Sequence, residues 1–183
     1  MLSYGRKNGK YNMNYYGESV QIEKDNSHLF NKIYMKLRPD IKTIETNKDK
    51  RTQLLGVDKI LYLDNGCTYY IQEKCRPYKW YDDILLEYIS NDRTMSPGWM
   101  EKDQLCNYLF YLVKYISQVY WFKWLPLKQL WDTNRDKWIS YGEQRLYGFS
   151  RISAPNPDYN TISVGVPPDI LLNNIPKSGV VDI

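Results

Sequence analysis

The sequence predicts a mixed α/β (α+β) fold in a single domain over residues 1–183, with a mixed central sheet flanked by helices. Three observations carry this prediction. Apolar residues recur at helical spacing before Pro39, and two β-rich runs flank the turn sequence Asp64-Asn65-Gly66. Strand-like and helical patterns then alternate toward the C-terminus. With 183 residues and 43% hydrophobic content, the chain is long enough to bury one sizeable core.

The first regular element expected is a helix over residues 19–37. Its apolar residues fall on one arc of a helical wheel, a serine can cap its start, and Pro39 ends the pattern. Glu23 projects within the apolar arc, where a carboxylate needs a partner. Residues 1–16 are expected to form an irregular arm or a short strand, and the charged residues 40–53 a loop.

A β-hairpin follows, with strands over residues 57–63 and 67–75. Asn-Gly and Asp-Asn-Gly sequences between β-rich runs are strong hairpin signals. Residues 77–80 break the second strand, and residues 83–90 read as a third strand, apolar on both faces except at Glu87. A strand of that kind is typical of the centre of a sheet.

The turn at Asp64-Asn65-Gly66 leaves two registers open. A two-residue loop would set Asp58 opposite Glu73, whereas a three-residue loop with its glycine in the left-handed region would set Asp58 opposite Gln72. Lys74 then lies two residues further on the same face. We favour the second register, because it gathers a carboxylate, an amide oxygen and an ammonium where a divalent cation and a phosphate could be held together.

Beyond Ser96-Pro97-Gly98-Trp99, which reads as a turn, the patterns predict further helices and strands. The expected helices cover residues 100–116, 126–140 and 170–175, and the expected strands cover residues 119–125, 146–153 and 161–166.

Asp58, followed fourteen positions later by Gln72-Glu73-Lys74, resembles the metal-binding half of the PD-(D/E)xK (restriction-endonuclease-like) nuclease superfamily, in a Gln-x-Lys variant. In that superfamily an early helix carries a Glu, the Asp and the D/E/Q residue hold Mg²⁺, and the Lys orients or activates the attacking water. The resemblance implies a restriction-endonuclease-like core with added C-terminal strands. It assigns catalytic roles to Asp58, Gln72, Glu73, Lys74 and Glu23.

The same resemblance implies a metal-dependent nuclease that hydrolyses phosphodiester bonds, with DNA favoured over RNA and a homodimer as one arrangement. Mg²⁺ or Mn²⁺ would be held by Asp58, Gln72 and Glu73. A pattern of Glu73-Lys74, Glu87 and Gly98-Trp99 also resembles small phage-encoded members. Two alternatives stay open: an inactive nuclease-fold protein that binds nucleic acid or a protein partner, and an ordinary surface salt bridge on a structural protein.

Basic residues are concentrated near the N-terminus, where the first 60 residues carry 12 Lys/Arg against 7 Asp/Glu. A solvated loop and a phosphate-contacting surface explain this excess equally well. The second reading assigns nucleic-acid binding to Lys48, Lys50, Arg51, Lys59 and Arg76.

Other function classes find little support in the sequence. The three cysteines have no C-x-x-C spacing, so they predict neither a zinc site nor a disulfide framework, and no P-loop or nucleophile elbow is present. No signal peptide is recognisable and no apolar run approaches about 20 residues. We therefore expect a cytoplasmic, reduced protein, in a phage-infected host if the second pattern holds, with no membrane partner.

Overall fold

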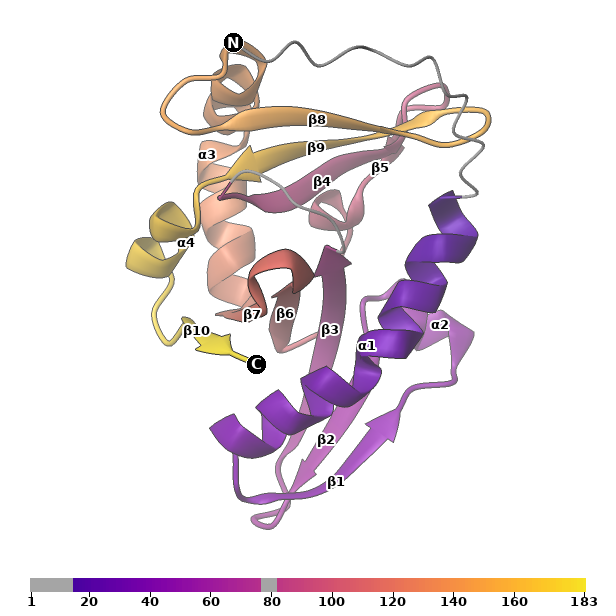
Figure 1. Ribbon diagram of the computed structural model, residues 1–183, viewed down its shortest axis with the longest axis vertical. Coiled ribbons are helices and arrows are strands. Elements are labelled where there is room, and N and C mark those ends of the chain that lie inside the picture. The colour runs from indigo at the N-terminus through magenta and orange to yellow at the C-terminus, as the bar shows by residue number, and fades with distance from the viewer. Residues whose placement is uncertain (1–14, 77–81) are drawn as a thin grey trace, which may run out of the picture.

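The computed structural model describes residues 15–76 and 82–183, with side chains described from residue 25 onward, and shows a mixed α+β architecture built on two sheets (Figure 1). The larger sheet is mixed and the smaller is antiparallel. In spatial order, the six-stranded sheet contains β1 (Ile41–Thr46), β2 (Lys59–Leu63), β3 (Thr68–Arg76), β6 (Tyr108–Val113), β7 (Gln118–Lys123) and β10 (Gly179–Asp182). The four-stranded sheet contains β5 (Ser96–Pro97), β4 (Ile84–Asn91), β9 (Asn160–Val166) and β8 (Ser150–Pro155).

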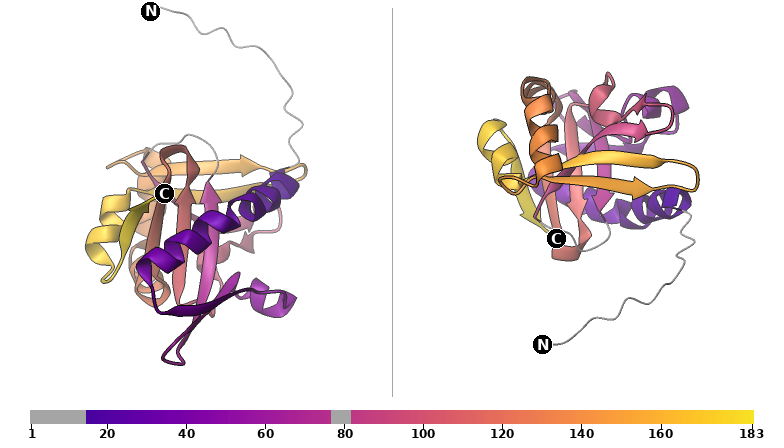
Figure 2. Two further views of the ribbon diagram at one scale, coloured as in Figure 1. Left: turned by 60° about the horizontal axis from the view of Figure 1, so that its bottom comes forward. Right: turned by 90° about the horizontal axis from the view of Figure 1, so that it is seen from above.

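One face of the larger sheet is covered by α1 (Tyr15–Leu37), which lies diagonally across the strands (Figure 2, left). Phe30, Ile33 and Tyr34 on the helix pack against Ile71 and Leu112 on the sheet, and all five side chains are buried. Burial of this apolar stripe explains why the amphipathic pattern forms a helix here. The helix ends at Leu37, two residues before the proline.

The opposite face of the larger sheet packs against the smaller sheet and α3 (Trp124–Gln144). Buried side chains from β6 and β7, such as Leu109 and Phe122, join Leu86 of β4 and Trp131 of α3 in one core cluster. A short helix, α4 (Pro168–Asn174), also contributes to it. Among the described residues, no helix is long and apolar enough to span a membrane.

The strand β6 runs parallel to β3, and the chain between them passes through the smaller sheet. A buried ion pair joins the two sheets at the start of this excursion. Arg76 at the end of β3 pairs with the carboxylate of Asp83, just before β4, and its Nη1 also donates to the Asp83 carbonyl at 2.9 Å. Ser150 Oγ on β8 donates to Asp83 Oδ2 at 2.7 Å. The buried Asp83 carboxylate therefore connects β3 and β8 at the start of β4.

Most of the predicted elements are present. The helix over 19–37, the hairpin, the strands over 83–90 and 119–125, the helix over 126–140 and the C-terminal elements are confirmed as α1, β2–β3, β4, β7, α3, β8, β9 and α4, with boundaries shifted by a few residues. β4 is internal in its sheet, as its two apolar faces predicted. Residues 77–80, and all but the last two of residues 1–16, lie outside the described residues.

Three predictions of secondary structure are wrong. The turn expected at Ser96-Pro97-Gly98-Trp99 is the strand β5 followed by the start of a 3-10 turn. Residues 40–53 are not a loop: they contain β1 and a short helix, α2 (Lys50–Leu54). β1 is an edge strand with only one buried side chain, so its sequence lacks a strong apolar pattern. Residues 100–116 are not a helix but a 3-10 turn, the strand β6 and a second 3-10 turn. A strand buried on both faces has an apolar run that periodicity cannot distinguish from a buried helix.

The buried ion pair leads to a stability prediction. Asp83→Ala should lower the free energy of unfolding by about 3–5 kcal/mol, because Arg76 would retain a buried charge without its partner carboxylate. The control is Asp132→Ala, which breaks the solvent-exposed pair with Lys128 on α3 and should cost about 1 kcal/mol or less. Urea denaturation of both variants measures the difference, and similar losses would contradict the assigned role of Asp83.

Candidate functional site

The hairpin adopts the three-residue loop, so the favoured register is confirmed. Lys59 pairs with Ile71 in the ladder, and Leu63 N–H donates to the Cys67 carbonyl at 3.0 Å. Gly66 has φ +82° and its N–H donates to the Leu63 carbonyl at 3.0 Å. The left-handed conformation of this glycine is what closes a three-residue loop.

This register places Asp58 opposite Gln72 at the open end of the hairpin. The Asp58 N–H donates to the Ile71 carbonyl at 2.8 Å, and its carboxylate Oδ2 accepts from the Glu73 N–H at 2.8 Å. Both bonds hold Asp58 beside the middle of β3. The charge of the Lys74 ammonium lowers the pKa of the same carboxyl group, so Lys74 lies within electrostatic reach of Asp58, as the register requires.

Gln72 is buried with 4% of its surface exposed, and no hydrogen-bond partner for its Oε1 is found among the described residues. A buried amide oxygen of this kind is rare in proteins unless a water or a ligand bonds to it. Gly56, with φ +74°, makes room for this amide: an added Cβ would lie 3.2 Å from Gln72 Nε2 and 1.9 Å from Gln104 Oε1. The left-handed backbone of Gly56 favours glycine at this position beside Gln72.

The smaller sheet brings a second carboxylate to the site. Glu87 on β4 accepts a hydrogen bond from the Trp99 N–H at 3.3 Å, and Gly98 packs so closely that an added Cβ would lie 2.4 Å from the Glu87 carbonyl oxygen. The Lys74 ammonium lies 6.0 Å from the centre of the Trp99 ring. A cavity of about 450 Å³ between the sheets is lined in part by Lys74, Glu87 and Trp99.

Burial shapes the electrostatics of these side chains. Burial raises the pKa of both the Asp58 and the Glu87 carboxyl groups. The charge of the Lys74 ammonium lowers these two pKa values, but the effect of burial is larger, so both remain raised. Burial, together with the Asp58 charge, raises the pKa of the Cys106 thiol to about 12, so this cysteine is an inert neighbour. Two poorly solvated carboxylates thus flank one ammonium, an arrangement that favours an additional cation.

Glu73 lies on the other face of the sheet from Gln72 and Lys74. Its carboxylate accepts a hydrogen bond from the Tyr34 hydroxyl of α1 at 2.6 Å, in a buried position. The structure therefore connects Glu73 to Asp58 through its backbone N–H rather than through its side chain. Glu23 lies in α1, but its side chain is outside the described residues.

The predicted phosphate-binding residues divide into two groups. Lys59 is 4% exposed and its ammonium donates to Ser27 Oγ at 2.7 Å and Thr46 Oγ1 at 2.8 Å, while Arg76 is buried against Asp83. Neither is positioned to meet a phosphate at the surface, which corrects that assignment. The remaining three are exposed around the start of α2, namely Lys48, Lys50 and Arg51.

The segment that carries these exposed cations is fixed to the site. Asn47 Nδ2 donates to the Val57 carbonyl at 2.6 Å, and the Asn47 N–H donates to the Asp58 carbonyl at 3.0 Å. The base of the α2 segment is thus bonded to the residues that lead into the hairpin. Gln104 and Cys106 also border the site and were missed in the sequence, because nothing in their local pattern marks them.

Within residues 25–76 and 82–183, no group of three or more His, Cys, Asp or Glu side chains is arranged to hold a metal ion. The oxygen donors that the hairpin itself offers are the Asp58 carboxylate and the Gln72 amide oxygen. No family model, curated protein or solved structure matches the chain, so these residues must be interpreted from their geometry.

The raised pKa of Asp58 predicts how a substitution there changes stability. Asp58→Asn should raise the free energy of unfolding at neutral pH by about 0.5–2 kcal/mol, because it removes a buried charge and its amide oxygen can still accept from the Glu73 N–H. Folding favours the protonated form of Asp58, so the wild type loses stability as the pH rises above about 3.9, the value for an unfolded Asp.

Asn cannot ionise, so the gain should be present near pH 7 and should disappear below about pH 4. Melting temperatures of the two proteins at the two pH values provide the measurement. A variant that is less stable near neutral pH, or equally stabilised at both values, would contradict the proposed burial of the charge.

Proposed function

We propose that the chain is a metal-dependent nuclease that hydrolyses phosphodiester bonds, with DNA the favoured substrate. The observation that carries this proposal is that Asp58 lies opposite Gln72 at one end of the hairpin and within electrostatic reach of Lys74, with the Gln72 amide oxygen buried and without a partner among the described residues. The mixed sheet, with an N-terminal helix across one face, supports the restriction-endonuclease-like core that the Asp58 and Gln72-Glu73-Lys74 pattern implies.

The donor set fits Mg²⁺ or Mn²⁺. Asp58 supplies a carboxylate and Gln72 an oxygen that lacks another partner, and both are hard donors of the kind these ions take. Mg²⁺ commonly binds through only one or two carboxylates together with substrate phosphates, so a sparse protein donor set is compatible with a site completed by the nucleic acid. When bound, such an ion lowers the pKa of a coordinated water and neutralises charge on the phosphate.

The remaining residues have separate roles in the proposal. Lys74 neighbours both carboxylates and can hold a phosphate oxygen or orient the attacking water. Glu87 has a pKa raised by burial, which suits it to accept a proton from that water. The exposed cations near α2, Lys48, Lys50 and Arg51, hold the nucleic-acid backbone beside the site.

A second candidate function is a nuclease-fold protein that binds nucleic acid or a protein partner without cleaving. One observation favours it: position 72 carries a neutral amide, so the hairpin supplies a single carboxylate to a metal ion. A neutral oxygen is a weaker Mg²⁺ ligand than a carboxylate. The two functions share the same surface and differ in whether a metal ion binds there productively.

Cleavage assays on single- and double-stranded DNA and RNA, with Mg²⁺ and with Mn²⁺, test the first function. Lys74→Met should reduce the cleavage rate by about 10²–10⁴-fold, as expected when a group that orients water or stabilises charge is lost. Lys137→Met on α3, an exposed lysine away from the site, should leave the rate unchanged. Full activity in Lys74→Met would rule out the proposed site, and nucleic-acid binding without cleavage of any form would favour the second function.

A further inference from the structure

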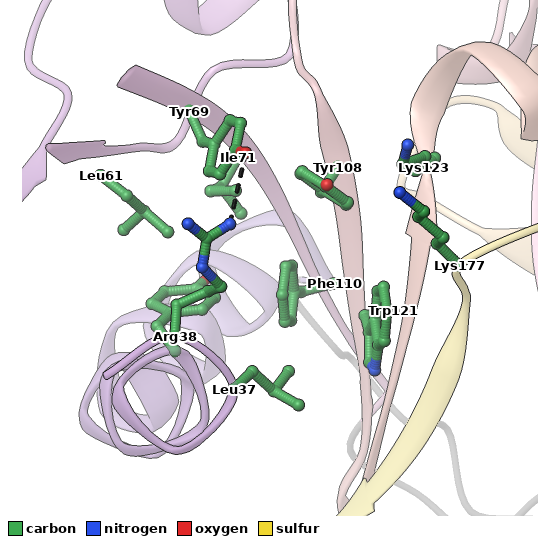
Figure 3. Close-up of a pocket in the computed structure, with 11 residues that line it drawn as sticks. Leu37, Arg38, Leu61, Tyr69, Ile71, Tyr108, Phe110, Trp121, Lys123 and Lys177 are labelled. Carbon is green, nitrogen blue, oxygen red and sulfur yellow. Dashed lines mark hydrogen bonds between the residues drawn. The ribbon is translucent and has the colours of Figure 1, made fainter. Parts of the chain in front are cut away.

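A pocket of about 340 Å³ lies on the α1-facing side of the larger sheet, between the end of α1 and the strands β7 and β10 (Figure 3). Of its eleven lining residues, five are aromatic, three are aliphatic and three are basic, and none is acidic. The volume is near the lower end of the range of about 300–1,000 Å³ typical of small-ligand sites. It therefore suits one compact group.

Several of the aromatic rings that line the pocket are accessible from it. The Tyr108 and Trp121 rings have centroids 6.3 Å apart and planes inclined by 56°, and the Tyr69 ring lies 5.4 Å from Tyr108 in an edge-to-face arrangement. All three side chains are only partly buried. Gly179 on β10 lets the indole pack closely against the backbone, because an added Cβ would lie 2.8 Å from Trp121 Nε1. A flat group can stack on the face of one of these inclined rings while the others contact its edge.

The cations stand on two sides of these rings (Figure 3). Arg38 is neutralised by Asp40, whose carboxylate accepts two hydrogen bonds from the guanidinium at 2.8 and 2.7 Å. Lys123 and Lys177 stand on the other side, and no ion pair is found for either within the described part of the chain. Lys177 has φ +54°, a conformation that a non-glycine residue adopts at a cost.

We propose that this pocket binds one nucleotide of a single-stranded nucleic acid, with the base stacked on Tyr108 and its edge against Trp121, and a neighbouring phosphate held by Lys123 and Lys177. Aromatic platforms with adjacent cations are how single strands are bound without sequence preference. A base inside a duplex is paired and stacked, so it cannot present its face to such a pocket. The aromatic rings and the adjacent ammonium groups therefore select a nucleotide whose base is not paired.

Binding at this pocket does not depend on cleavage. Ile71 and Phe110 in the pocket face α1, whereas Gln72 and Lys74 belong to the opposite face of the same strand β3. Binding at the pocket therefore needs no metal ion, and it can be measured in EDTA whether or not the chain is a nuclease.

The test is the fluorescence anisotropy of a labelled oligothymidylate of about ten nucleotides, a length within the ~4–16 that one single-strand-binding fold covers. Lys177→Gly removes the ammonium at a position where glycine is conformationally favoured, so the fold should be retained. We expect weaker binding and a slope of log affinity against log salt that is smaller by about 0.7, the value for one lost phosphate contact on a single strand.

A matched control is Arg145→Gly, at the C-terminal end of α3. Arg145 also has a left-handed backbone, at φ +55°, is exposed and carries one positive charge. The length of α3 puts it about 30 Å from Lys123, at about 1.5 Å per helical residue. This control should bind as the wild type does, and an equal loss in the two variants would overturn the proposal.

A second pair of variants tests the stacking. Tyr108→Leu should weaken binding by about fivefold or more, the lower end for one stacked base, whereas Tyr108→Phe should bind like the wild type. Unchanged binding in Tyr108→Leu would overturn the proposal, and if this variant does not fold, Lys177→Gly decides alone. Thymidine monophosphate or duplex DNA competing as well as the single strand would overturn the assignment to a strand.

Discussion

The register of the β2–β3 hairpin is the constraint on which the candidate site depends. Gly66 closes a three-residue loop, and the ladder that follows sets Asp58 beside Gln72 and within the electrostatic reach of Lys74. Side chains alternate along a strand, so a shift of one residue would send Lys74 to the face covered by α1. One left-handed glycine thus decides which side chains of β3 face the smaller sheet and which face the helix.

The two faces of β3 have different environments as a result. On one face, the Glu73 carboxylate accepts a hydrogen bond from the Tyr34 hydroxyl of α1. The backbone N–H of Glu73 donates a hydrogen bond to the Asp58 carboxylate. On the other, Lys74 meets Glu87 from the smaller sheet. Stability and the candidate chemistry are therefore linked through a single strand. The buried Arg76–Asp83 pair at the end of that strand joins the two sheets whose side chains form the site.

Local patterns in the sequence were sufficient for the hairpin, its register and most helices and strands, because turn chemistry and apolar periodicity act over a few residues. They failed for β6, whose continuous apolar run suits a buried helix as well as a buried strand, and for β1, an edge strand with little to bury. The burial of Lys59 could not be foreseen, since its partners Ser27 and Thr46 are distant in sequence. Glu87 stands out in the sequence as the exception on an apolar strand, but its proximity to Lys74 depends on the packing of two sheets.

Calorimetric titration with Mn²⁺ tests most directly the claim that Asp58 and Gln72 form a metal site. We expect weak binding to the wild type, no binding heat in Asp58→Ala, and tighter binding in Gln72→Glu, because a carboxylate replaces a neutral amide oxygen that lacks another partner. An Asp58→Ala protein that binds Mn²⁺ as the wild type does, or a Gln72→Glu protein that binds none, would contradict the account.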